Sequence, residues 1–186
     1  MESKVLYTLE YLVGHLDNID NLKLKANILR NYEGRNFMED SPEDIRYEDI
    51  RLDLFPEVKK LMRTLMDKFE EQYGLKIKPV PTSDPNEVVW AVVHQHNEST
   101  NWHDHATHTN YNKGAKVSAV YYVDVPHNSG DIVFKVYENP FVTKMYLEKA
   151  ETGKFIMFDS TLLHCVTKNL SNYNRIIISM NFTFDD

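Results

Sequence analysis

The chain has 186 residues and a formal net charge of −7, from 21 lysines and arginines against 28 aspartates and glutamates. This length predicts one domain over residues 1–186, and no apolar run approaches the roughly 20 residues that cross a membrane. The acidic balance argues against nucleic acid as a partner. The single cysteine, Cys165, cannot form an internal disulfide, which favours a cytoplasmic location.

The first 75 residues are expected to be mostly helical and to support the rest of the domain. Residues 56–73 carry apolar side chains at steps of three and four, with Pro56 at the first turn and Gly74 as a stop. Residues 21–33 predict a second helix, whereas residues 4–16 fit either a helix or a strand. The acidic segment 34–53 predicts a loop or a short irregular helix.

From residue 75 onward, the sequence changes to the alternation that is typical of β-strands. Turn signals such as Asn128-Ser129-Gly130 separate segments rich in β-branched and aromatic residues. The predicted strands are 75–80, 88–96, 116–125, 131–137, 154–159 and 175–184. Because no helices lie between them, a parallel α/β sheet is excluded. The expected fold is mainly β, with residues 76–186 forming a sandwich or jelly roll and the helices packed on one outer face.

Histidine is unusually concentrated, since six of eight lie between positions 94 and 127. His103 and His105 would share one face of an extended chain, while Asp104 would point to the other face. Two imidazoles so placed can bind one divalent metal ion. His94 and His96 form a second such pair, at the end of the preceding strand.

A further histidine and an arginine belong to the late part of the chain. His164 follows a Ser/Thr bend, and Arg175 begins an alternating strand eleven residues later. Ser179 and Asn181 share the polar face of that strand with Arg175. A polar face inside a barrel implies a cavity for a polar ligand, and the planar guanidinium of Arg175 matches a carboxylate of a dicarboxylic acid. The alternative is that Arg175 begins an exposed edge strand.

In their order along the chain, these segments resemble the 2-oxoglutarate- and Fe(II)-dependent oxygenases related to prolyl hydroxylases, a family common in bacteria and bacteriophages. The resemblance covers about residues 88–184. It rests on the His-x-His pair, Ser118 to Val123, the Ser129-Gly130 turn, His164, and Arg175 to Phe182. It implies a double-stranded β-helix core and a non-haem iron enzyme that hydroxylates an unknown peptidyl or small-molecule substrate. A phage origin would place it in the host cytoplasm.

The resemblance also implies roles for individual residues. The three metal-binding, catalytic positions fall on His103, His105 and His164. The position that pairs with the far carboxylate of 2-oxoglutarate falls on Arg175. Other residues expected to contact this cosubstrate are Ser179, Asn181, and Tyr121 or Tyr122, depending on which face of their strand is inward. The implied cofactors are Fe(II) and 2-oxoglutarate, with dioxygen as the oxidant.

The metal ligands depart from the family pattern, which has two histidines and a carboxylate two residues after the first histidine. Here Asp104 directly follows His103, and His105 occupies the carboxylate position. Three arrangements are open. The favoured one is a three-histidine centre. In the others, a bulge brings Asp104 to the metal, or His105 is the first ligand with Thr107 opposite it.

Two other classes of protein fit the same pattern. A cupin-like metalloprotein would use the jelly roll and three histidines without 2-oxoglutarate. A non-catalytic jelly roll with a binding or structural role would carry its histidines as surface residues. In the favoured interpretation, His94, His96 and His108 are neighbours of the site, and the protein is a monomer or a homodimer.

Overall fold

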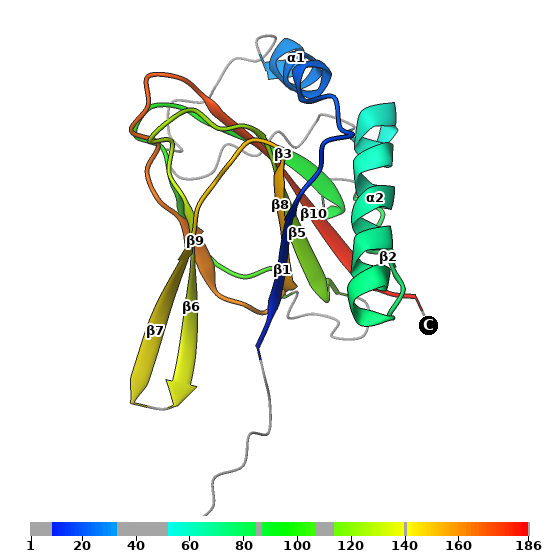
Figure 1. Ribbon diagram of the computed structural model, residues 1–186, viewed down its shortest axis with the longest axis vertical. Coiled ribbons are helices and arrows are strands. Elements are labelled where there is room, and N and C mark those ends of the chain that lie inside the picture. The colour runs from blue at the N-terminus through cyan, green and yellow to red at the C-terminus, as the bar shows by residue number, and fades with distance from the viewer. Residues whose placement is uncertain (1–8, 33–51, 85–86, 107–113, 140, 186) are drawn as a thin grey trace, which may run out of the picture.

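A computed structural model of the protein describes residues 9–32, 52–84, 87–106, 114–139 and 141–185. Within these residues, two antiparallel β-sheets form the main body, and helices α1 (Asn21–Tyr32) and α2 (Pro56–Tyr73) lie on the outer side of the larger sheet (Figure 1). The predicted mainly β fold with N-terminal helices on one outer face is therefore confirmed. None of the described helices is long and apolar enough to span a membrane.

The strands of the larger sheet, sheet A, follow the order β1–β8–β5–β10–β2, and β3 also pairs with β10. Sheet B has the order β4–β9–β6–β7. The bounds in sheet A are β1 Tyr11–His15, β2 Ile77–Pro79, β3 Val89–His94, β5 Val117–Asp124, β8 Lys154–Asp159 and β10 Arg175–Phe184. Those in sheet B are β4 Thr100–His103, β6 Ile132–Asn139, β7 Val142–Glu148 and β9 His164–Val166.

Helix α2 forms as its sequence predicts and covers sheet A with its apolar face. Pro56 occupies the first turn, and Gly74 ends the helix with a φ of 66° and a backbone N–H that donates to the carbonyl oxygen of Glu70. The buried residues of the helix are Val58, Leu61, Met62, Leu65 and Phe69. They join the apolar outer face of sheet A in one hydrophobic core.

Strand β10 separates this core from a second core between the two sheets. Ile176 and Ile178 pack toward the helices, whereas Ile177 packs in the second core. The polar residues Arg175, Ser179 and Asn181 have the same parity as Ile177, and all are buried. Because neighbouring residues of a strand point to opposite faces, these polar side chains lie on the side of sheet B.

The strands that sequence patterning did not predict are short or exposed. Residues 11–15, within the ambiguous segment 4–16, form edge strand β1, which pairs with β8. Residues 142–148, which lie outside the predicted strands, form β7, whose side chains are almost all exposed. Strands β4 and β9 have only four and three residues. Of the predicted loop 34–53, residues 34–51 lie outside the described residues, and Leu52–Leu54 form a 3-10 turn.

Replacing Gly130 by alanine is expected to destabilise the fold more than replacing Gly74. Both have positive φ, but a Cβ at Gly130 would lie 2.2 Å from the carbonyl oxygen of Thr167, whereas nothing lies within 4 Å at Gly74. We expect G74A to lower the free energy of unfolding by about 1 kcal/mol and G130A by about 3 kcal/mol, because strain and overlap add. Urea denaturation measures both losses. Equal losses would contradict this close contact between the turn before β6 and the end of β9.

Candidate active site

Three histidines converge between the two sheets at one end of sheet B. His103, the last residue of β4, pairs in register with His164, the first residue of β9. His105 follows two residues later, and its ring centroid lies 5.2 Å from that of His103 and 5.1 Å from that of His164. One potential ligand atom from each of these residues lies within 4.8 Å of the other two. We call His103, His105 and His164 the histidine triad.

Hydrogen bonds to the Nδ1 atoms orient the triad. Nδ1 of His103 lies 2.8 Å from the carbonyl oxygen of Asn101, and Nδ1 of His164 lies 2.8 Å from that of Leu162. A carbonyl oxygen only accepts, so each Nδ1 carries the proton. The lone pair of each ring is therefore on Nε2. This is how metal-binding histidines are normally oriented.

His105 is oriented by side chains instead of by a carbonyl group of the backbone. Its Nδ1 lies 2.9 Å from Oδ1 of Asn181 and 3.0 Å from Oγ of Ser118. The amide group of Asn181 donates to the carbonyl oxygen of Glu87, so its oxygen faces the histidine. Ser160 completes the network through a 2.9 Å contact with Ser118. Asn181, predicted to contact the cosubstrate, thus contacts a member of the triad.

Asp104 is not a member of the metal-ligand group that the structure brings together. Its side chain is exposed, and its Oδ1 accepts a hydrogen bond from the backbone N–H of Ala106. The geometry of the described residues therefore favours the three-histidine arrangement over the bulge that would bring Asp104 to a metal. Thr107 and His108, which enter the other sequence-based predictions, lie outside the described residues.

Burial keeps His164 neutral. The side chain is almost completely buried, which lowers its pKa to about 3, and the neighbouring His103 and His105 act in the same direction. Neutral imidazole is the form that binds metal ions. His164 is therefore in the neutral form that can bind a metal ion near neutral pH.

Arg175 is fully buried on the inner face of β10. Its Nη2 donates to Nδ1 of His94 at 2.7 Å, but its Nε and Nη1 find no acceptor among the described residues. Burial lowers the pKa of Arg175 to about 10, so the guanidinium stays charged near neutral pH. β10 pairs with β5 and β3, which excludes the alternative of an exposed edge strand.

Sequence reasoning placed His94 only among the neighbours of the site, yet it is the described hydrogen-bond partner of Arg175. The two residues are direct cross-strand partners of β3 and β10. The available signal was the alternation of β3, where Trp90, Val92 and His94 share one face. His96, the other member of that pair, is exposed, and its ring contacts the carbonyl oxygen of Ser171.

The two candidate tyrosines of β5 point to opposite sides of sheet A. The Tyr121 hydroxyl donates to Oδ1 of Asn21 in α1, so Tyr121 faces the helices and not the triad. Tyr122 packs in the core between the sheets, where burial raises the pKa of its hydroxyl. Of the two, only Tyr122 is placed to contact a ligand on the inner side.

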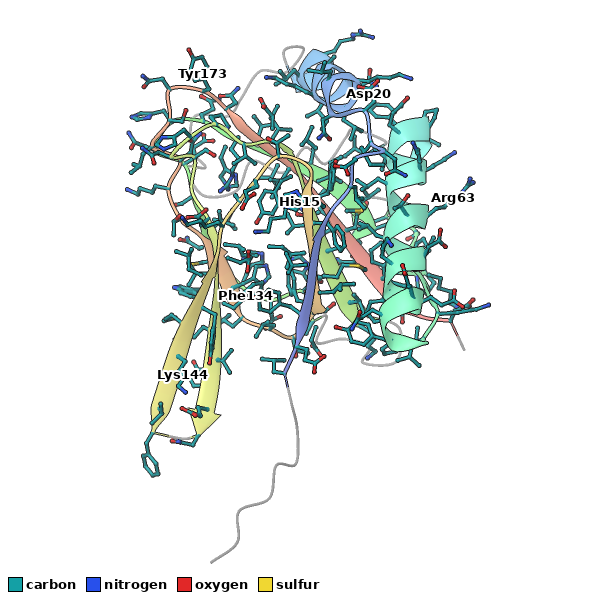
Figure 2. The ribbon with its side chains drawn as sticks, in the orientation of Figure 1. His15, Asp20, Arg63, Phe134, Lys144 and Tyr173 are labelled. Atoms are coloured by element: carbon teal, nitrogen blue, oxygen red, sulfur yellow. The ribbon has the colours of Figure 1, made fainter. Side chains whose placement is uncertain are left out.

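A cavity between the sheets is lined by the triad and by a largely apolar wall. Phe134 lies between the sheets (Figure 2), and its ring centroid is 6.1 Å from that of His164. Thr100 and Ser179 supply polar groups to the lining. The apolar lining residues are Trp90, Val92, Ala119, Val120, Ile132, Phe158, Val166 and Ile177. Such a mixture of apolar walls and few polar groups is typical of small-molecule sites.

Two packed antiparallel sheets with a histidine triad at a cavity between them define a jelly-roll protein with a candidate metal site. Residues 88–181, just over half of the chain, match the family described as "Putative 2OG-Fe(II) oxygenase". The chain belongs to this family, and it is a non-haem oxygenase that depends on Fe(II) and 2-oxoglutarate. The sequence-based prediction of the family and its cofactors is confirmed, and the cupin-like and non-catalytic alternatives are not supported.

Solved structures of oxygenases share the fold. The carbocyclase SnoK from nogalamycin biosynthesis is 13% identical, with a TM-score of 0.69 over 95% of this chain and 80% of its own. A prolyl-4-hydroxylase from Pseudomonas putida is 13% identical, with a TM-score of 0.63 over 96% and 95%. A prolyl hydroxylase from Trichoplax adhaerens is 15% identical, with a TM-score of 0.61 over 94% and 83%. No curated protein matches the chain by sequence.

We expect Asn181→Leu to weaken metal binding. The substitution removes the acceptor that orients the His105 ring, and loss of such a partner typically costs about 10- to 100-fold in metal affinity. Calorimetric titration with Mn(II) measures the change. Asn181→Asp, which keeps an acceptor for His105 but loses the N–H that donates to Glu87, is the comparison variant and should bind Mn(II) more tightly than Asn181→Leu. Unchanged affinity in Asn181→Leu would contradict the role of Asn181.

The metal-free protein should lose stability as the pH falls below about 6.5, the ordinary pKa of histidine. Burial lowers the pKa of His94 and His164 to about 3, so the unfolded chain takes up protons that the folded chain does not. Between pH 7.5 and 5.5, each histidine should remove about 1.4 kcal/mol from the free energy of unfolding.

Urea denaturation in chelator tests this expectation. His94→Gln should reduce the pH-dependent loss by about 1.4 kcal/mol. His127→Gln, at an exposed histidine, should leave the loss unchanged. The same loss in His94→Gln as in the wild type would show that His94 is not held neutral in the fold.

Proposed function

We propose that the histidine triad holds Fe(II) through its three Nε2 atoms and that Arg175 binds the distal carboxylate of 2-oxoglutarate. The observation that carries this proposal is the state of Arg175, a fully buried cation with two N–H-bearing nitrogens that find no acceptor among the described residues. An unpaired buried charge is costly. A carboxylate in the cavity would supply the missing partner through charge-assisted hydrogen bonds.

The donor set of the triad fits a divalent transition metal. Three imidazole nitrogens suit Fe(II), and His103, His105 and His164 would hold the ion. When bound, the iron supplies the oxidation of the substrate by dioxygen, coupled to decarboxylation of 2-oxoglutarate to succinate. The histidines contribute no negative charge, so a bound cation and Arg175 would together attract a dianionic cosubstrate.

The remaining residues of the cavity bind, orient and exclude water. His103 and Thr100 lie three residues apart on β4, or roughly 10 Å, so the cavity extends along this strand away from the triad. The apolar side chains between these ends keep water from the cosubstrate. Tyr122 and Ser179 lie on the inner faces of β5 and β10, where each would add a hydroxyl to the cosubstrate site.

The reaction class that follows is hydroxylation of a peptidyl side chain or a small molecule. The solved structures that share the fold include prolyl hydroxylases, which act on a peptidyl side chain, and a carbocyclase from nogalamycin biosynthesis. The protein is proposed to act in the cytoplasm as a monomer or a homodimer. The single cysteine supports a reducing compartment, and the net charge of −7 argues against nucleic acid as a partner.

The assignment is tested by separating metal binding from cosubstrate binding. We expect His164→Ala to abolish stoichiometric Mn(II) binding and succinate formation by the iron-loaded protein. Arg175→Gln should keep Mn(II) binding but raise the KM for 2-oxoglutarate by about 100-fold, because a buried charged contact is lost. Calorimetry and a succinate assay under air measure the two effects.

His96→Ala is the matched control, because it removes an exposed histidine near the site. It should leave both metal binding and succinate formation unchanged. Stoichiometric Mn(II) binding in His164→Ala would overturn the triad as the metal site. Unchanged KM in Arg175→Gln would overturn Arg175 as the carboxylate partner.

A further inference from the structure

His94 occupies an unusual place for a histidine that binds no metal. Its side chain is buried, and both of its ring nitrogens have side-chain partners. Nδ1 lies 2.7 Å from Nη2 of Arg175, and Nε2 lies 2.8 Å from Oγ1 of Thr100. Hydrogen bonds at both ring nitrogens hold the His94 ring in one orientation. They also link strand β3 to β10 through Arg175 and to β4 through Thr100.

The donors and acceptors in this contact have a single consistent assignment. A guanidinium group has no acceptor, so Nδ1 of His94 must accept the hydrogen bond from Arg175. The proton of the neutral ring is then on Nε2, which donates to the hydroxyl of Thr100. Burial and the neighbouring Arg175 lower the pKa of His94 to about 3, so the ring remains an acceptor at physiological pH.

The contact determines which part of Arg175 is available to a ligand. With Nη2 held by His94, the Nε and Nη1 groups are the ones that find no acceptor among the described residues. An arginine side chain has several rotatable bonds, and holding one nitrogen removes much of that freedom before the ligand arrives. Thr100 also lines the cavity and lies on the same strand as His103. The contact therefore ties the arginine to the strand that carries a member of the triad.

We propose that His94 is a positioning residue that holds the guanidinium of Arg175 ready for the distal carboxylate of 2-oxoglutarate. This inference rests on the proposed role of Arg175. His94 acts through Arg175 and makes no contact with the metal or the reacting atoms. Its loss should therefore weaken recognition of the distal carboxylate while leaving binding of the keto-acid end at the metal unchanged.

The experiment compares two ligands of the Mn(II)-loaded protein by calorimetry. One is 2-oxoglutarate. The other is 2-oxopentanoate, which has a methyl group in place of the distal carboxylate. The ratio is the dissociation constant of 2-oxopentanoate divided by that of 2-oxoglutarate, and it measures the contribution of the distal carboxylate. We expect His94→Leu to lower this ratio by about 10-fold, the equivalent of about 1.4 kcal/mol, because Arg175 is no longer held.

Conservative and control variants show whether His94 positions Arg175 or only supports the packing of the core. His94→Asn keeps an acceptor close to the position of Nδ1 and should retain the ratio to within about 3-fold, as expected for a partly restored hydrogen bond. Thr100→Val should reduce the ratio less than His94→Leu does. His127→Leu, at an exposed histidine, should not change it. Unchanged binding of 2-oxopentanoate in each variant would show that the metal site is intact.

The outcomes distinguish this inference from the proposed function. If the wild-type protein binds both acids equally, Arg175 does not recognise the distal carboxylate and the proposed function itself is wrong. If the wild type prefers 2-oxoglutarate and His94→Leu keeps the full preference, Arg175 retains its role but His94 does not position it. If His94→Leu loses binding of both acids equally while His94→Asn restores neither, His94 supports only the core.

Discussion

The site depends on the register of β10, the strand that pairs with both β3 and β5 of sheet A. Its alternation sends isoleucines toward the helices and polar side chains toward sheet B. Arg175 then faces His94, and Asn181, six residues or roughly 20 Å further on, contacts His105. One strand thus places the proposed carboxylate partner and the residue that orients a proposed metal ligand. A shift of one residue would reverse both faces and remove the site and the core together.

The buried charge of Arg175 is the reason that we propose an anionic ligand between the sheets. The hydrophobic core that supports β10 does not compensate a guanidinium group, and neutral His94 satisfies only one of its nitrogens. A ligand that accepts hydrogen bonds from the remaining nitrogens of Arg175 would bind the folded protein and not the unfolded chain. It therefore stabilises the fold as well as occupying the site. The same desolvation that makes the arginine costly makes its interaction with a carboxylate strong.

Hydrophobic periodicity in the sequence was sufficient to predict the helices and strands that bury one face. Strand β10 has the predicted bounds because its residues alternate strictly between apolar and polar. Helix α2 has the predicted bounds because Pro56 marks its start and Gly74 its end. Strand β7 was not predicted because its side chains are exposed and no burial imposes alternation. The contact between His94 and Arg175 was not predicted because the two residues are 81 positions apart in the chain. The His-x-His pair was found because both members lie on one short segment.

The three histidines of the triad provide no negative charge to offset that of a bound metal ion. In the usual triad a carboxylate offsets part of the metal charge, whereas the three ligands proposed here are neutral imidazoles. The groups that orient them are neutral as well, since the partners are two carbonyl oxygens and, for His105, the amide of Asn181 and the hydroxyl of Ser118. We therefore expect the ligand to supply the compensating negative charge. A dianionic cosubstrate bound to both the metal and Arg175 would supply it, so cosubstrate binding and metal retention should reinforce each other.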